Sequence, residues 1–259
     1  MTYTYHDVRA SYGGAKAEQE RHDLMFRFFA RPLSFPIAWL GLRLGLRPND
    51  VTVVSLVINV LGLAMMLTGS RIVMVTGVIL VLLALVLDAA DGNMARTARQ
   101  FSPVGEWLEG IGSYLLCGWF HLAGGIGAWR ALMKQDPVTG WPTTAAEGGW
   151  LIAFGAIAAT GITISILAAA KFSVVFPSVD RAEVVARRGQ GFYGMLFTVG
   201  RNLSFASGLV LPLTLVGILT GRYEVVLAGF ALLNTSMMVI VLGRCLLLAK
   251  KATRTGVAG

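Results

Sequence analysis

Six long apolar stretches constrain this chain more than any other feature of its sequence. A transmembrane helix needs about 20 residues to cross roughly 30 Å of hydrocarbon. Stretches of about that length lie at 51–69, 72–90, 105–132, 149–170, 202–220 and 224–247. Charged residues make up only 14% of the 259 residues, against about 25% in soluble domains, so we expect lipid to cover most of the surface. The sequence therefore predicts an all-α polytopic membrane protein, a single domain over residues 1–259, with six transmembrane helices.

Residues 1–50 precede the first apolar stretch and differ from it in composition. Within them, residues 24–46 mix apolar side chains with arginines, and two prolines interrupt the run. These punctuating residues are Arg27, Arg31, Arg43, Arg47, Pro32 and Pro36. Arginines beside exposed apolar residues are typical of helices that lie in the membrane surface, and proline breaks a helix because it lacks an amide hydrogen. We therefore predict a cytoplasmic or interfacial N-terminal segment, with an amphipathic stretch over 24–46 that lies on the membrane surface.

The basic residues are distributed unevenly between the connections. A net charge of +8 could mean a nucleic-acid partner in a soluble chain, but here the charges lie between apolar stretches, where they set topology. Of the 22 lysines and arginines, Arg71, Arg130, Lys134 and Arg222 fall on one side, and the other 18 share the side of both termini. The basic side faces the cytoplasm. We expect a multi-pass inner-membrane protein with both termini in the cytoplasm and no nucleic-acid partner.

A polar cluster at the end of the second apolar stretch indicates chemistry. Asp88, Asp91, Gly92, Ala95 and Arg96 follow apolar residues directly, where ionisable side chains are costly unless they are used or paired. An α-helix has about 3.6 residues per turn, which brings the two acids and the two small residues to one face. Carboxylates at this spacing can share a hard divalent cation. The small residues leave space beside it, so the pattern predicts a site for a metal and a phosphorylated ligand.

The third apolar stretch carries a matching face. Gly105, Glu109 and Ser113 recur at four-residue steps and so lie along one side of a helix. Glu109 could complete a cation site with Asp88 and Asp91 from across the helix pair. The alternative is that the Asp-Gly pair forms only a turn and that the nearby arginines only set topology. That alternative does not explain why three acids lie on the facing sides of two neighbouring helices. We predict Mg²⁺ or Mn²⁺ held by Asp88, Asp91 and Glu109.

These residues resemble the motif of the CDP-alcohol phosphotransferase family, Asp-x2-Asp-Gly-x2-Ala-Arg-x8-Gly-x3-Asp-x3-Asp. Its first six defined positions are matched by Asp88, Asp91, Gly92, Ala95, Arg96 and Gly105. The sequence before the first stretch also resembles the Pro-Asn-x-x-Thr start of that family's first span. The resemblance implies a homodimeric membrane transferase that moves a phospho-alcohol group from a CDP-linked donor to an acceptor and releases CMP, as in phospholipid biosynthesis. It implies a nucleotide site formed by Asn49, Thr52, Asp88, Gly92, Ala95, Arg96 and Gly105.

The chain departs from this motif at its last two positions. The motif's third Asp is Glu109 here, and its fourth is Ser113. The resemblance implies that the third acid binds metal, which Glu109 can do with its longer arm. It also implies that the fourth acid is the general base that takes the proton of the acceptor hydroxyl. Ser113 cannot be that base, because its own hydroxyl is too weakly acidic to ionise.

Three explanations of this catalytic position stay open. Glu109 or Glu106 takes over as the base; the acceptor is already ionised, as a phosphate, phosphonate or carboxylate is; or turnover is lost and the chain only binds nucleotide or metal. Glu109 is expected to hold metal, and Glu106 lies about 100° from Gly105 around the helix. We therefore favour an ionised acceptor.

The acceptor is expected to be a lipid or a small anion or polyol. Basic residues near the cytoplasmic face could bind an anionic one, and the candidates are Lys171, Arg187 and Arg188. The alternative is that these charges only set topology. A small transporter is the remaining alternative function, and it would need polar groups along a path near mid-membrane. The charged residues cluster at one end of the spans instead, which favours an enzyme that opens to one side.

Overall fold

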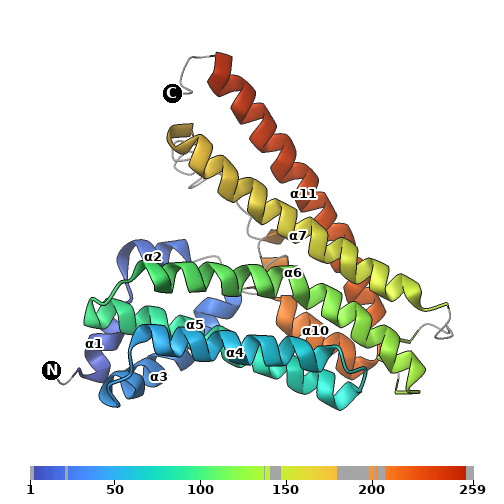
Figure 1. Ribbon diagram of the computed structural model, residues 1–259, viewed down its shortest axis with the longest axis horizontal. Coiled ribbons are helices and arrows are strands. Elements are labelled where there is room, and N and C mark those ends of the chain that lie inside the picture. Colours follow the sequence, from blue (N-terminus) through green and yellow to red (C-terminus); the bar gives the residue numbers. More distant parts are fainter. Residues whose placement is uncertain are drawn as a thin grey trace.

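The structure is a computed structural model that describes residues 3–20, 23–136, 138–140, 147–179, 199–200, 202–203 and 208–254. Every regular element in these ranges is a helix (Figure 1), which confirms the all-α fold class for the part of the chain described. In chain order the helices are α1 (Tyr5–Ala10), α2 (Gly14–Gln19), the π-helix η1 (Phe26–Ala30), α3 (Arg31–Arg43), α4 (Pro48–Met66), α5 (Arg71–Ala98), α6 (Pro103–Met133), α7 (Gly149–Val175), α10 (Val210–Thr220) and α11 (Tyr223–Arg254).

Four helices among the described residues are long and apolar enough to cross a membrane. They are α4, α5, α7 and α11, which correspond to the first, second, fourth and sixth predicted spans. The third predicted span is α6, a 31-residue helix that is not among these four. The fifth is described only as α10, whose 11 residues cover about 17 Å, too little to cross the hydrocarbon. The structure thus supports four of the six predicted spans.

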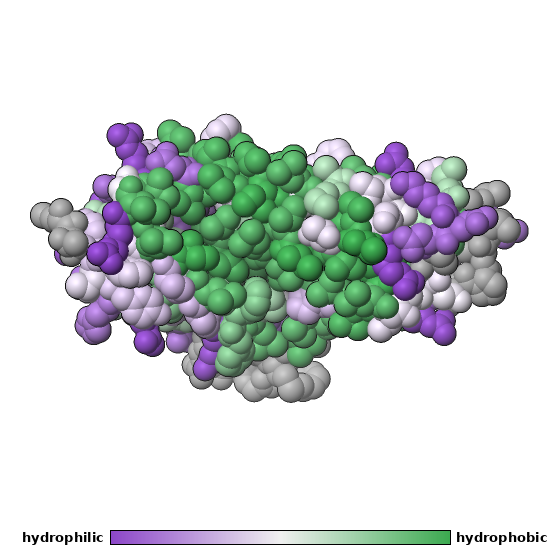
Figure 2. Space-filling model, turned by 90° about the horizontal axis from the view of Figure 1, so that it is seen from below, coloured by the Kyte–Doolittle hydropathy of each residue, from purple (hydrophilic) through white to green (hydrophobic). Residues whose placement is uncertain are grey.

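The outer surface of the bundle suits a lipid environment. Figure 2 shows a broad apolar band between two hydrophilic ends on the face that it presents. Along α4, Val53, Val57 and Leu61 recur at four-residue steps and are each about half exposed, at 46%, 54% and 52%. A continuous apolar surface of this kind marks contact with a membrane or a partner. Together with the four long apolar helices, it supports a multi-pass membrane protein.

Close backbone contacts hold the bundle together. Gly62 of α4 faces Gly77 of α5, and a Cβ on Gly62 would lie 2.7 Å from the Gly77 carbonyl oxygen. Small residues allow membrane helices to approach this closely. α6 packs mainly against α4 and α7 and makes few contacts with α5, while α7 packs along α11. In Figure 1, α7 and α11 diverge as a pair from the other helices, so the core that carries the motif is formed by α4, α5 and α6.

The N-terminal segment, residues 3–45, packs against α5 through α1, η1 and α3. α3 runs without a break from Arg31 to Arg43 with Pro36 inside it, so the two prolines interrupt the apolar run of the sequence but not the helix. α3 continues directly from η1, since the Arg31 amide donates to the Phe26 carbonyl oxygen. Pro32 and Pro36 therefore each remove one hydrogen bond from a continuous helical stretch. The segment exposes Phe28, which is 68% accessible, but its position on a membrane surface stays a prediction.

A buried ion pair anchors this segment to the core. Both carboxylate oxygens of Glu20 accept hydrogen bonds from Arg31, at 2.7 and 2.5 Å, and both side chains are only 5% exposed. Arg31 also donates to the Ala89 carbonyl oxygen at 2.9 Å and to Oδ1 of Asn93 at 3.0 Å. Tyr12 donates to Glu20 at 3.1 Å, and partial burial raises the pKa of Tyr12, which keeps the phenol protonated as a donor. The segment is therefore tied to the part of α5 that carries the motif.

Candidate active site

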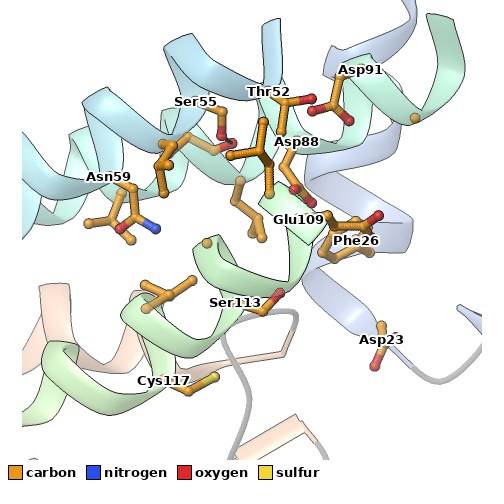
Figure 3. A pocket seen from close by; sticks show the side chains of 18 of the residues that line it. Asp23, Phe26, Thr52, Ser55, Asn59, Asp88, Asp91, Glu109, Ser113 and Cys117 are labelled. Atoms are coloured by element: carbon orange, nitrogen blue, oxygen red, sulfur yellow. Dashed lines mark hydrogen bonds between the residues drawn. The ribbon is translucent and has the colours of Figure 1, made fainter. Parts of the chain in front are cut away.

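A cavity of about 370 Å³ lies between α4, α5, α6 and the N-terminal segment (Figure 3). A second cavity of about 520 Å³ adjoins it, because both are lined by Thr52, Asp91, Gly92, Arg96 and Glu109. Asp88 and Ser113 line the first cavity. Asn49, Ala95 and Gly105 line the second. The two cavities thus bring together every site residue that the sequence predicted at the start of the first span and at the junction of the second and third spans.

Asp88 and Asp91 lie one turn apart on α5, and both line the first cavity (Figure 3). Asp91 is only 8% exposed, and its Oδ2 atom is buried without a hydrogen-bond partner. The charges of Asp88 and Glu109 act on it through space. A buried carboxylate oxygen that accepts no hydrogen bond is costly, and a cation is the partner that offsets this cost. The aspartate pair therefore fits a hard divalent cation, which binds oxygen ligands.

The third predicted metal ligand is less closely placed. Glu109 lines the cavity from α6, but it is exposed, and α6 makes few contacts with α5. Among the residues that the structure describes, no group of three His, Cys, Asp or Glu side chains lies close enough together to hold a metal ion. Asp88 and Asp91 are consequently the better supported part of the predicted metal site. The participation of Glu109 stays a prediction.

Asn93 holds Arg96 at the boundary between the two cavities. Nη2 of Arg96 donates to Oδ1 of Asn93 at 2.7 Å, and the same oxygen accepts from Arg31. Asn93 is fully buried, so this acceptor is fixed in place. A Cβ on Gly92 would lie 3.4 Å from a guanidinium nitrogen of Arg96, so the glycine keeps the space beside that guanidinium open. The result is a positioned cation, which is suited to binding a phosphate oxygen.

Asn49 joins the first turns of α4 and α6. Its amide donates to Oγ of Ser102 at 3.0 Å, and that hydroxyl caps α6 by accepting from the Gly105 amide at 2.9 Å. A Cβ on Gly105 would lie 2.7 Å from Oδ1 of Asn49, so a larger residue here would displace the Asn49 side chain. Asn49 and Gly105 therefore have a structural role in shaping the second cavity, beside the nucleotide contact predicted for them.

The acceptor side of the site is less complete. Ser113 is exposed and lines the first cavity, whereas Glu106 is exposed and lines only the second. Lys171 is exposed on α7 and is not among the described residues that line either cavity. Arg187 and Arg188 lie outside the described residues. The predicted contacts between these basic residues and an anionic acceptor stay predictions.

Sequence reasoning missed two acids that line the first cavity from the N-terminal segment. Glu20 and Asp23 are 4% and 3% exposed, and both face the same cavity as Asp88 and Asp91. In the sequence, these two acids only precede an apolar run. Acidic residues are common at the edge of a membrane, so this pattern does not indicate a site. The contact of Arg31 with α5 spans 58 to 62 positions of the chain, and a single sequence does not reveal such a pairing.

The fold and the site define a helical membrane protein with an acidic cavity next to a positioned arginine. The sequence profile of the CDP-alcohol phosphatidyltransferase family matches residues 46–177. That range includes α4, α5, α6 and α7, and with them every motif residue of the two cavities. The chain therefore belongs to the CDP-alcohol phosphatidyltransferase family, which confirms the resemblance found in the sequence. No curated protein matches the chain. Glu20 and Asp23 lie outside the family match.

Proposed function

We propose that the protein is a metal-dependent membrane transferase that moves a phospho-alcohol group from a CDP-linked donor to an acceptor and releases CMP. The observation that carries this proposal is the aspartate pair on α5. Asp91 keeps a buried oxygen without a hydrogen-bond partner, and Asp88 and Arg96 line the same cavity. A diphosphate with its cation complements this arrangement, because the metal satisfies the carboxylates and the guanidinium binds a phosphate oxygen.

Each residue of the donor side has a role in this proposal. Asp88 and Asp91, with Glu109, hold Mg²⁺ or Mn²⁺, which neutralises the diphosphate and stabilises CMP as the leaving group when it is bound. Arg96, fixed by Asn93, contacts a phosphate. Thr52 and the small residues Gly92, Ala95 and Gly105 bound the space for the nucleotide, since all of them line the second cavity. The acceptor is a lipid or a small anion or polyol.

The placement in the cell belongs to the same proposal. The basic residues of the connections support an inner-membrane protein with both termini and the site on the cytoplasmic side. Labelling from outside intact cells of tags at either terminus would contradict this orientation. The family resemblance supports a homodimer, which cross-linking in membranes tests directly.

Binding without turnover is the second candidate, and a specific observation favours it. Ser113 stands where the motif has its base, and it lines the cavity as an exposed hydroxyl. A chain of this kind would bind a CDP-linked donor in the presence of metal and release no CMP. One assay separates the two candidates, because donor binding and CMP release can be followed on the same sample.

The test is CMP release by purified protein from CDP-glycerol or CDP-diacylglycerol with Mn²⁺, with and without chelator. We expect release only with the metal, and we expect Asp88→Asn and Asp91→Asn each to lower it by at least about 100-fold, since they remove a ligand rather than an outer-shell contact. Asp136→Asn is a matched control, because Asp136 caps the other end of α5 by accepting from the Arg71 amide. Release that survives both chelator and the α5 substitutions would contradict the proposed function.

A further inference from the structure

If the acceptor is a hydroxyl rather than an ionised group, the proposed transfer needs a group to take its proton. General-base help contributes about 10²–10⁴-fold to the rate of such a step. Ser113 cannot provide it, and the metal occupies the carboxylates of α5 in the proposed function. A base must therefore come from another element that reaches the first cavity.

Asp23 is such a group. It lies on the N-terminal segment and lines the same cavity as Asp88, Asp91 and Ser113, although it stands 90 positions before Ser113 in the chain (Figure 3). Only 3% of it is exposed, so it faces the protein interior rather than bulk solvent. The buried Oδ2 of Asp91 in this cavity indicates independently that a ligand belongs here.

The backbone around Asp23 fixes its position. The Asp23 amide donates to the Glu20 carbonyl oxygen at 3.0 Å, and the Asp23 carbonyl oxygen accepts from the Arg27 amide at 2.9 Å. The next residue, Leu24, donates its amide to Oδ1 of Asn202 at 2.9 Å. These contacts hold the residue between a turn, the start of a helix and a distant part of the chain. A base must be positioned in this way to meet a bound substrate.

The other carboxylates near the cavity are less suited to this role. Both oxygens of Glu20 accept from Arg31, so its charge is committed to the ion pair that anchors the segment. Glu106 is exposed and lines only the second cavity. Glu109 is the predicted third metal ligand. Asp23 is buried, unlike the exposed Glu106 and Glu109, and it lines the first cavity from outside the motif.

We propose that Asp23 is the general base of the transfer, supplied from outside the family motif to the position that Ser113 leaves without one. The acceptor O–H proton passes to a carboxylate oxygen of Asp23, and the acceptor oxygen forms a bond to the phosphorus that carries the alcohol. The bond from that phosphorus to the bridging oxygen breaks, and CMP leaves with the electron pair. This inference rests on the proposed function. It implies that the acceptor reacts through a neutral hydroxyl group.

The test compares two acceptors with the same donor, CDP-glycerol, and Mn²⁺. Glycerol requires a base, whereas inorganic phosphate is already ionised and does not. We expect Asp23→Asn, which keeps the shape of the side chain, to lower CMP release with glycerol by about 10²–10⁴-fold and to change release with phosphate far less. Glu18→Gln is the matched control, because Glu18 is an exposed acid of the same segment that lies outside the described lining of the first cavity.

A second variant separates a base from a structural residue. Adding Ser113→Asp to Asp23→Asn returns a carboxylate to the motif position, and we expect this double variant to recover glycerol-dependent CMP release. Equal release by wild type and Asp23→Asn with glycerol, or a loss in Glu106→Gln instead, would overturn the inference while leaving the proposed function intact. So would a double variant that stays as inactive as Asp23→Asn while wild type is active. A wild type that releases no CMP with any donor or acceptor overturns the proposed function itself.

Discussion

The core helices within residues 46–177 and the N-terminal segment, residues 3–45, build one cavity in different ways. The core brings its functional groups together by periodicity: Asp88 and Asp91 share a helix face, and Glu109 lies on the next helix. The segment reaches the same cavity with Asp23 through a tertiary contact. Arg31 pairs with the buried Glu20 and also donates a hydrogen bond to the Ala89 carbonyl oxygen of α5. The first region lies within the family match, and the second lies outside it.

This difference suggests a division of labour. The groups proposed to bind the donor all lie within the matched range, where the motif is intact. The group proposed to activate the acceptor lies outside it, and the motif departs from its pattern only at Glu109 and Ser113. A family can keep donor chemistry constant and change the acceptor side by recruiting a residue from a neighbouring segment, since function depends on the site rather than on the fold.

The largest effect on stability is expected when the buried ion pair between Glu20 and Arg31 is broken. Arg31→Met takes away the guanidinium from which both Glu20 oxygens accept and leaves that carboxylate buried. Removing one partner of a buried ion pair costs about 3–5 kcal/mol. We expect this loss in the free energy of unfolding in mild detergent, together with greater proteolysis of residues 3–45.

Two variants sharpen this prediction. Replacing both partners, as Arg31→Met with Glu20→Met, should recover much of the loss, because an apolar pair avoids the uncompensated charge. Arg43→Met is the matched control: Arg43 is exposed and lies over the Trp39 ring at 5.0 Å, a contact that contributes about 0.5–1 kcal/mol at an exposed site. If Arg31→Met and Arg43→Met lowered the free energy of unfolding by similar amounts, the Glu20–Arg31 pair would not be what anchors the segment.

A smaller effect is expected within the core. Gly62→Ala places a Cβ 2.7 Å from the Gly77 carbonyl oxygen and 2.8 Å from Cγ2 of Val81, so α4 and α5 must separate, at about 1–3 kcal/mol. Gly243 of α11 has no atom within 4 Å of such a Cβ, and Gly243→Ala should stabilise the protein by about 0.5–1 kcal/mol. Thermal unfolding of the two variants measures this difference, and a shift of equal sign in both would contradict the packing described here.

The sequence predicted the core better than the segment for physical reasons. Helical periodicity and the cost of charge in a membrane are local properties, so the spacing of Asp88, Asp91 and Gly92 was enough to predict that they share one cavity. Four of the six predicted spans are supported by long apolar helices among the described residues, and the spans at 105–132 and 202–220 stay predictions. Arg31 illustrates the limit for charges: it was interpreted as a residue of an interfacial stretch, but it is buried and paired with Glu20.

Pro36 shows a related limit. It lies inside α3, although a proline removes one hydrogen bond from a helix, so a proline in the sequence does not mark a helix end here. Asp23 could not be assigned to the site at all, because its place in the cavity depends on contacts with distant residues such as Asn202. Local patterns therefore predicted the residues of the proposed donor side, and only the tertiary structure brought Asp23 to the same cavity.

The most direct test of the proposed division is equilibrium binding of CDP-glycerol in the presence of Mn²⁺, measured by calorimetry on wild type, Asp91→Asn and Asp23→Asn. Asp91 is assigned to the donor side and Asp23 to the acceptor side. We expect Asp91→Asn to weaken donor binding by at least about 10–100-fold, whereas Asp23→Asn should bind the donor as wild type does and fail only in turnover with a hydroxyl acceptor. Loss of donor binding in Asp23→Asn as large as that in Asp91→Asn would contradict it.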